Sequence, residues 1–136
     1  MQQSDVIVVG CGGLGAVVAH DLAQAGAQVL GLDRHPPGHA HGSSHGQTRV
    51  IRKAYFEHPD YVPLLLRSYA RWRDLEACCA EDLLHLCGVL EVGPADGIVV
   101  PGVLRAAAEH QLQVEALDAA DLRQRFNQLG CIDDGL

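Results

Sequence analysis

The chain has 136 residues, of which 48% are hydrophobic, and it carries a formal net charge of −7. This length suits about one ordinary domain, and the acidic balance argues against nucleic acid as a general partner. No apolar run approaches the roughly 20 residues of a membrane span, and no secretory signal precedes the first apolar stretch. We therefore expect no membrane association and a cytoplasmic location. The five cysteines suggest reduced thiols that pack in a core.

The first informative feature is a glycine-rich turn, Gly10-Cys11-Gly12-Gly13-Leu14-Gly15. A strand is predicted over 5–9 from the apolar run Val6–Val9, a helix over 14–25 and a second strand over 28–32. Asp33 follows that second strand. This order of strand, glycine turn, helix, strand and acid is typical of dinucleotide-binding folds. A glycine-rich turn without a ligand is the plain alternative.

Each glycine of the motif has its own physical role. Gly10 lets the chain turn sharply off the strand, Gly12 lets a pyrophosphate approach the backbone, and Gly15 lets the helix pack tightly on the sheet. The start of the helix offers unpaired N–H groups to the phosphates. Asp33 would accept hydrogen bonds from the adenosine ribose, and Arg34 beside it leaves a small opening for a 2′-phosphate.

A loop over 35–48 follows, with four histidines and no hydrophobic period. Metal binding by His35, His39, His41 and His45 is a rival interpretation, but no cysteine or acid completes a ligand set nearby, so we predict no metal site.

Shorter elements are predicted after the loop. Asp60 is the expected N-cap of a helix of about 18 residues, and Asp118 the expected N-cap of a last helix. One face of the first of these helices is predicted to be apolar, with Tyr61, Leu64, Leu65, Ser68, Trp72, Leu75 and Cys79. The remaining predictions are strands over 83–86, 89–92 and 112–115, and helices over 102–110 and 119–126.

The segment from Gly42 to Arg52 is a second stretch dense in chemistry. It supplies hydroxyls at Ser43, Ser44 and Thr48. Arg49 and Arg52 are three residues apart, so on a helical turn they would share a face. Two guanidinium groups can hold an anionic cofactor ring or a substrate carboxylate. The plain alternative is a solvated turn whose arginines pair with nearby acids.

Four features of the chain together resemble a known family. They are the glycine turn with Asp33, the loop Gly42-Ser43-Ser44-His45-Gly46-Gln47-Thr48-Arg49-Val50-Ile51-Arg52-Lys53-Ala54-Tyr55, the segment Tyr61-Val62-Pro63-Leu64, and Trp72. They are similar, in register over nearly the whole chain, to the amino-terminal part of the sarcosine oxidase and N-methyltryptophan oxidase family of FAD-dependent amine oxidases.

The resemblance implies an α/β fold with a Rossmann-like FAD-binding βαβ unit of the glutathione-reductase type. Residues 1–80 would form the FAD-binding portion, and residues 81–136 the beginning of an α+β substrate domain. It also implies FAD-dependent oxidation of the C–N bond of a secondary or N-methyl amino acid. Oxygen would accept the electrons and give hydrogen peroxide, and the partner would be a small carboxylate-bearing amine.

The resemblance further implies roles for individual residues. FAD would be bound by Gly10, Gly12, Gly13, Gly15, Asp33, Arg34, Ser43, Thr48 and Arg49. Arg49 would place positive charge near the flavin ring, Arg52 would bind the substrate carboxylate, and His45 would stand near the ring. Ser44 replaces a second histidine that is common in relatives, which affects the expected polarity of the active site.

Relatives are markedly longer, and their flavin-linking cysteine and oxygen-activating lysine cannot be placed here. We therefore expect an incomplete chain that binds FAD weakly and oxidises no amine by itself. Two alternatives stay open. The chain could be a fragment of an NAD-dependent dehydrogenase, since the glycine motif does not choose between NAD and FAD, or a non-catalytic nucleotide-binding remnant.

Overall fold

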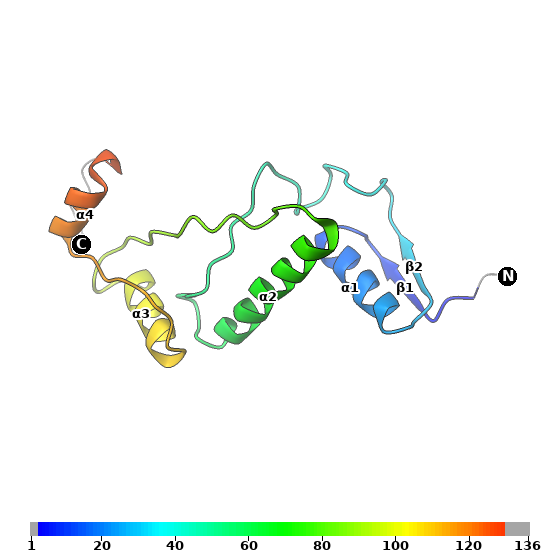
Figure 1. Cartoon of the computed structure of the whole chain (residues 1–136), viewed down its shortest axis with the longest axis horizontal. Helices are drawn as coiled ribbons and strands as arrows, with labels where there is room; N and C mark the ends of the chain where they lie inside the picture. The colour runs from blue at the N-terminus through cyan, green and yellow to red at the C-terminus, as the bar shows by residue number, and fades with distance from the viewer. Residues whose placement is uncertain (1–2, 130–136) are drawn as a thin grey trace. The chain divides into compact units, whose positions relative to one another are not determined.

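A computed structural model of the chain describes residues 3–129 (Figure 1). The chain divides into two compact units, Met1–Arg49 and Val50–Leu136. None of the helices in the described part combines the length and the apolar composition needed to cross a membrane.

The first unit is a βαβ element, as predicted. Strand β1 (Val6–Val9) leads into helix α1 (Gly13–Gln24), and strand β2 (Val29–Leu32) returns parallel to β1. Val6 pairs with Val29 and Val9 with Leu32. The helix ends where Gly26 takes a positive φ of 93°. The predicted strands and helix are confirmed to within one residue at each end.

One face of this two-stranded sheet is covered by α1, and the other is open. The alternation of a β-strand turns Val6 and Val8 to the half-buried face, where α1 contacts both strands. Ile7 and Val9 point the other way and are 56% and 83% exposed. Among residues 3–49 no side chain is fully buried. The first unit is therefore held together mainly by backbone hydrogen bonds and by one helix-covered face.

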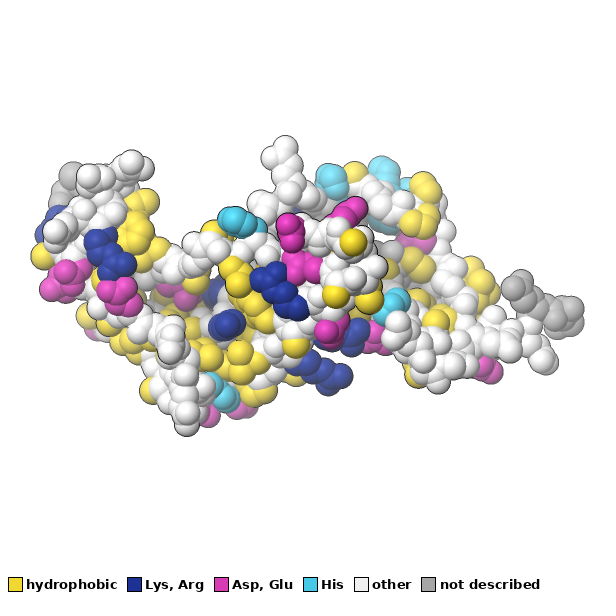
Figure 2. Space-filling view, in the orientation of Figure 1, with side chains coloured by type: hydrophobic (Ala, Val, Ile, Leu, Met, Phe, Trp, Pro, Cys, Tyr) yellow, Lys and Arg dark blue, Asp and Glu magenta, His cyan; other side chains and the backbone are white. Residues whose placement is uncertain are grey.

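The second unit contains helices α2 (Tyr61–Cys79), α3 (Val99–Glu109) and α4 (Ala119–Arg125), and a short 3-10 helix η1 (Asn127–Leu129). Its core is small, and the buried hydrophobic residues are Ala54, Val62, Ala106, Ala107 and Leu122. Many hydrophobic side chains are exposed to solvent, and they are visible in yellow on the surface drawn in Figure 2.

The strands predicted over 83–86, 89–92 and 112–115 are wrong. These segments carry no regular secondary structure, and among residues 3–129 the only sheet is the pair β1–β2. A strand exists only where a second strand takes up its N–H and C=O groups, and these segments have no such partner in the described part of the chain. The helix predicted over 102–110 begins earlier, at Val99, because Pro101 is tolerated in its first turn.

The helix predicted after Asp60 is confirmed as α2, but two details of it differ from the prediction. Asp60 occupies the N-cap position, but its backbone is already helical (φ −59°, ψ −17°) and its carboxylate caps nothing. The N–H of Val62 instead donates to the carbonyl of Pro59 at 2.9 Å. The predicted apolar face is largely exposed, with Leu64 at 64%, whereas Val62 on another face is fully buried. The hydrophobic period predicts the helix, but it does not identify the face that packs.

The cysteines do not pack in a core as expected. Cys78, Cys79 and Cys87 are exposed free thiols, and Cys11 is half-buried. Cys131 lies outside the described residues. The N-cap at Asp118 is confirmed, because its carboxylate accepts hydrogen bonds from Ala120 N and Asp121 N, both at 2.8 Å.

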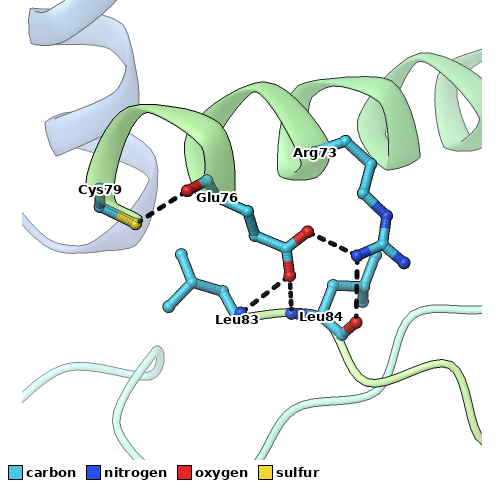
Figure 3. A network of polar contacts seen from close by, with 5 residues as sticks. All are labelled: Arg73, Glu76, Cys79, Leu83 and Leu84. Atoms are coloured by element: carbon cyan, nitrogen blue, oxygen red, sulfur yellow. Dashed lines mark hydrogen bonds and ion pairs between the residues drawn. The ribbon is translucent and has the colours of Figure 1, made fainter. Parts of the chain in front are cut away.

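The segment that leaves α2 is fastened to the helix by Glu76 (Figure 3). Its Oε1 accepts hydrogen bonds from the N–H groups of Leu83 at 2.8 Å and Leu84 at 2.7 Å, and its Oε2 pairs with Arg73 Nη1 at 2.5 Å. The hydrogen bond from the N–H of Leu84 has the largest effect on the pKa of the Glu76 carboxyl, and the bond from Arg73 the next largest. Both hold this pKa below its ordinary value. Glu76 thus fixes the path of the chain after the helix.

We predict that Glu76→Gln destabilises the second unit at neutral pH and that the loss fades in acid. A carboxyl whose folded pKa is lowered contributes stability above its ordinary pKa and loses that contribution as the pH falls through the lowered value. Urea unfolding followed by circular dichroism between neutral and acid pH measures the difference.

The matched control is Glu81→Gln, an exposed acid for which no ion pair is found among residues 3–129. It should change the unfolding free energy little at any pH. A difference between wild type and Glu76→Gln that stays constant with pH would contradict the assigned role of the Glu76 charge.

Candidate functional site

The glycine turn joins β1 to α1 and is shaped by close backbone contacts. Gly10 has a φ of +91°, which side-chain-bearing residues rarely adopt, and its N–H donates to the carbonyl of Leu32 at 2.7 Å. A Cβ at Gly15 would lie 2.9 Å from the carbonyl carbon of Gly10, so only glycine lets the helix start this close to the strand. The space beside Gly12 is open, because a Cβ at this residue would meet nothing within 4 Å.

Asp33 reaches the glycine turn from the end of β2. The carboxyl ends of parallel strands lie at one edge of a sheet, so the residue after β2 comes beside the residue after β1. The Oδ2 of Asp33 accepts the N–H of Cys11 at 2.6 Å, and its Oδ1 accepts the N–H of His35 at 3.0 Å. These two hydrogen bonds hold the pKa of the Asp33 carboxyl below its ordinary value, and the bond from Cys11 has the larger effect. The carboxylate is therefore ionised and oriented on the turn.

Three of the four loop histidines gather near Asp33. The rings of His35 and His41 stack with centroids 4.1 Å apart, and His39 Nε2 lies 3.6 Å from Asp33 Oδ1. The N–H of His41 donates to His39 Nδ1 at 3.1 Å, which leaves the ring proton of His39 on Nε2, the atom that faces Asp33. Within residues 3–129 no group of three or more His, Cys, Asp or Glu side chains could hold a metal ion.

Arg49 closes the loop that precedes it. Its guanidinium donates to the carbonyls of Thr48 at 2.8 Å, Ser43 at 3.0 Å and His45. The side chains of Ser43 and His45 are exposed, and the Thr48 hydroxyl makes a long contact of 3.5 Å with the carbonyl of Arg49. Arg34 is also exposed. Arg49 therefore stabilises the conformation of this loop.

Ser44 was expected near the site from the sequence, but no cofactor-binding role was assigned to it. Its Oγ accepts the N–H of Gly13 at 3.3 Å, which ties the loop to the first residue of α1. A Cβ at Gly13 would lie 2.6 Å from this oxygen. The sequence signals were the hydroxyl at position 44 and the extra glycine at position 13, which the motif itself does not require.

Arg52 belongs to the second unit. Residues 48–52 form no helical turn, so the expectation that Arg49 and Arg52 share a helical face is wrong. The Nη2 of Arg52 donates to both carboxylate oxygens of Glu57, at 3.0 and 3.1 Å. Its guanidinium lies 4.2 Å from the centre of the Tyr55 ring.

A second acid faces Arg52 from the segment after α2. The Nε of Arg52 lies 3.1 Å from Glu91 Oε1, as an ion pair whose geometry does not complete a hydrogen bond. Burial raises the pKa of the Glu91 carboxyl, and the charge of Arg52 opposes that rise. Arg52 is thus held between two carboxylates of its own unit.

The second unit also has an apolar pocket of about 110 Å³, lined by Val100, Val103, Leu104 and Leu122 with Glu91 and Glu115. Sites for drug-sized ligands are roughly 300–1,000 Å³. This pocket is too small for a flavin cofactor and lies outside the glycine turn and the loop that ends at Arg49.

Comparisons with known proteins give the family. The profile of the FAD dependent oxidoreductase (DAO) family matches residues 5–136. Monomeric sarcosine oxidase from Streptomyces avermitilis is 46% identical over 130 residues, which are 96% of this chain and 34% of that protein. N-methyl-L-tryptophan oxidase from Salmonella arizonae is 42% identical over 96% of this chain and 35% of that protein.

A comparison with solved structures also finds similarity to an amino acid oxidase. The open form of NikD, an unusual amino acid oxidase essential for nikkomycin biosynthesis, superposes with a TM-score of 0.70 at 30% identity, over 93% of this chain and 33% of that chain. The chain spans about a third of the length of the relatives it matches. Residues 5–136 therefore place this chain in the family of FAD-dependent oxidoreductases.

Proposed function

We propose that this chain carries the ADP-binding part of an FAD-dependent oxidase that acts on a secondary or N-methyl amino acid. The observation that carries the proposal is the position of Asp33, whose carboxylate is fixed on the N–H of Cys11 in the glycine turn. Family membership and the similarity to sarcosine and N-methyl-L-tryptophan oxidases support the choice of FAD and of the substrate class.

The residues of the first unit fit the ADP half of FAD. The two Asp33 oxygens each accept one backbone N–H and keep lone pairs for a ribose diol. The N-cap residue Gly12 has no side-chain cap, so the start of α1 can direct N–H groups at a diphosphate. The open space beside Gly12 leaves room for that approach.

When bound, FAD would supply the two-electron acceptor for oxidation of the substrate C–N bond, and oxygen would take the electrons onward to give hydrogen peroxide. Arg49 would supply positive charge close to the cofactor, and it shapes the loop that carries His45. Ser43 and Thr48 would contribute hydroxyls. These roles extend the resemblance of the loop to the family.

Arg52 is the proposed site for the substrate carboxylate. Its guanidinium is engaged by Glu57, which is 43% exposed in its side chain, and by Glu91, which is 17% exposed. A substrate carboxylate would have to displace the more exposed of the two, Glu57. Binding at Arg52 would therefore be an exchange of one carboxylate for another.

We further propose that residues 1–80 belong to an FAD-binding domain of the glutathione-reductase type and residues 81–136 to the start of a substrate domain. An NAD-dependent dehydrogenase fragment and a non-catalytic nucleotide-binding remnant are the competing functions. The choice between FAD and NAD is open to direct measurement.

We expect the chain to bind FAD and to bind NAD at least tenfold more weakly. Equilibrium dialysis of the purified chain against each cofactor gives both affinities, and a retained flavin is visible from its colour. Equal or tighter binding of NAD would favour the dehydrogenase interpretation. Because the chain is expected to oxidise no amine by itself, FAD binding without peroxide agrees with the proposal, whereas robust peroxide formation from an N-methyl amino acid would overturn both that expectation and the remnant.

Asp33 should decide recognition of the ribose. We predict that wild type binds ADP about tenfold more tightly than 2′-deoxy-ADP, because an ionised carboxylate makes strong hydrogen bonds to hydroxyl groups. In Asp33→Ala the ratio of the two affinities should fall to about one. Isothermal titration calorimetry measures both ligands.

Asp33→Asn is the conservative control, because the amide oxygen can still accept the N–H of Cys11 without the charge. Because the pKa of Asp33 is lowered, the preference of wild type for ADP should persist through mildly acid pH. A ratio that Asp33→Ala leaves unchanged would show that Asp33 does not contact the ribose.

A further inference from the structure

The hydroxyl of Ser44 lies at the start of α1, within the first unit. Its Oγ accepts the N–H of Gly13, the first residue of the helix, at 3.3 Å. The preceding residue, Gly12, provides no side-chain cap. Ser44 therefore satisfies from a distant loop one of the N–H groups that are unpaired at the start of a helix.

The close approach of Ser44 gives a reason for Gly13. A Cβ at this residue would lie 2.6 Å from Ser44 Oγ and 3.2 Å from Ser44 Cβ. Contacts this short force one of the two groups to move. The glycine at position 13 and the serine at position 44 are thus one structural pair, although 31 residues separate them.

The backbone around Ser44 is fixed by groups other than its own side chain. The guanidinium of Arg49 binds the carbonyls of Ser43 and His45, the residues on either side. The N–H of His45 also donates to the carbonyl of Gly42 at 3.2 Å. The loop therefore presents the Ser44 hydroxyl at α1 in a set position.

A hydroxyl that accepts one hydrogen bond can still donate one. No acceptor for the Ser44 hydroxyl is found among residues 3–129. If the proposed function is correct, the Ser44 hydroxyl lies beside the N–H groups of α1 that would face the cofactor diphosphate. We propose that Ser44 is a further cofactor-binding residue, which donates its hydroxyl hydrogen to a diphosphate oxygen while it holds the N–H of Gly13.

Two ligands separate a phosphate contact from a general effect on the fold. ADP carries the diphosphate and adenosine lacks it, and calorimetric titration of the full chain with each gives two affinities. Ser44→Ala should weaken ADP binding about tenfold, as expected for loss of a hydrogen bond to a charged group, and should leave adenosine binding unchanged. Ser44→Thr keeps the hydroxyl and should keep ADP affinity within about twofold.

A second variant tests the same contact without removing the hydroxyl. Gly13→Ala places a methyl group where it collides with Ser44 Oγ and should give the same selective loss for ADP. Ser4→Ala removes an exposed hydroxyl elsewhere in the unit and serves as the matched control. Circular dichroism checks that each variant keeps the helical signal of wild type.

The outcomes separate this inference from the function on which it rests. If wild type binds neither ADP nor FAD, both are wrong. If wild type binds ADP and Ser44→Ala binds it equally well or more tightly, the inference alone is wrong. Equal losses for ADP and adenosine would reduce Ser44 to a cap of α1 and would also overturn the inference.

Discussion

The first unit depends on how the unpaired N–H groups between β1 and α1 are satisfied. Asp33 takes the N–H of Cys11 and Ser44 takes that of Gly13. Each acceptor comes from a different later segment, so these two bonds tie β2 and the following loop to one turn. On the proposed function, a dinucleotide diphosphate would lie beside this turn. The residues that stabilise the turn, Asp33 and Ser44, are therefore also proposed cofactor-binding residues.

The second unit buries a few side chains, and several polar contacts hold it together as well. Glu76 holds the segment after α2, and Arg52 is held by Glu57 and Glu91. Hydrophobic residues such as Leu64 and Leu86 stay 64% exposed. The matched region is only about a third of the length of the relatives. Polar contacts of this kind specify local paths of the chain where little apolar surface is buried.

The sequence predicted those elements whose signal is local. The strands around Val8 and Leu30, the sharp turn at Gly10 and the cap at Asp118 all depend on neighbours along the chain, and all are confirmed. The strand predicted over 89–92 was wrong because a strand requires a partner, which the residues of the segment cannot specify. The prediction of the buried face of α2 was wrong for the same reason, because the burial of Val62 depends on residues distant in the sequence.

The candidate site was predicted to a similar extent. The order of strand, glycine turn, helix, strand and acid predicted the βαβ unit, and parallel strands in such a unit bring Asp33 beside the turn. Neither the contact of Ser44 with Gly13 nor the clamp of Arg49 on its own loop was predictable, because both depend on the fold of a segment without hydrophobic period.

The central claim is that the glycine turn of the first unit is the cofactor-binding surface. The most direct measurement is a titration of the isotope-labelled chain with FAD, followed by backbone amide chemical shifts. We expect saturable shifts at Cys11, Gly12 and Gly13, with little change in α3 and α4. Saturable binding of FAD that leaves the amides of the turn unmoved would contradict it.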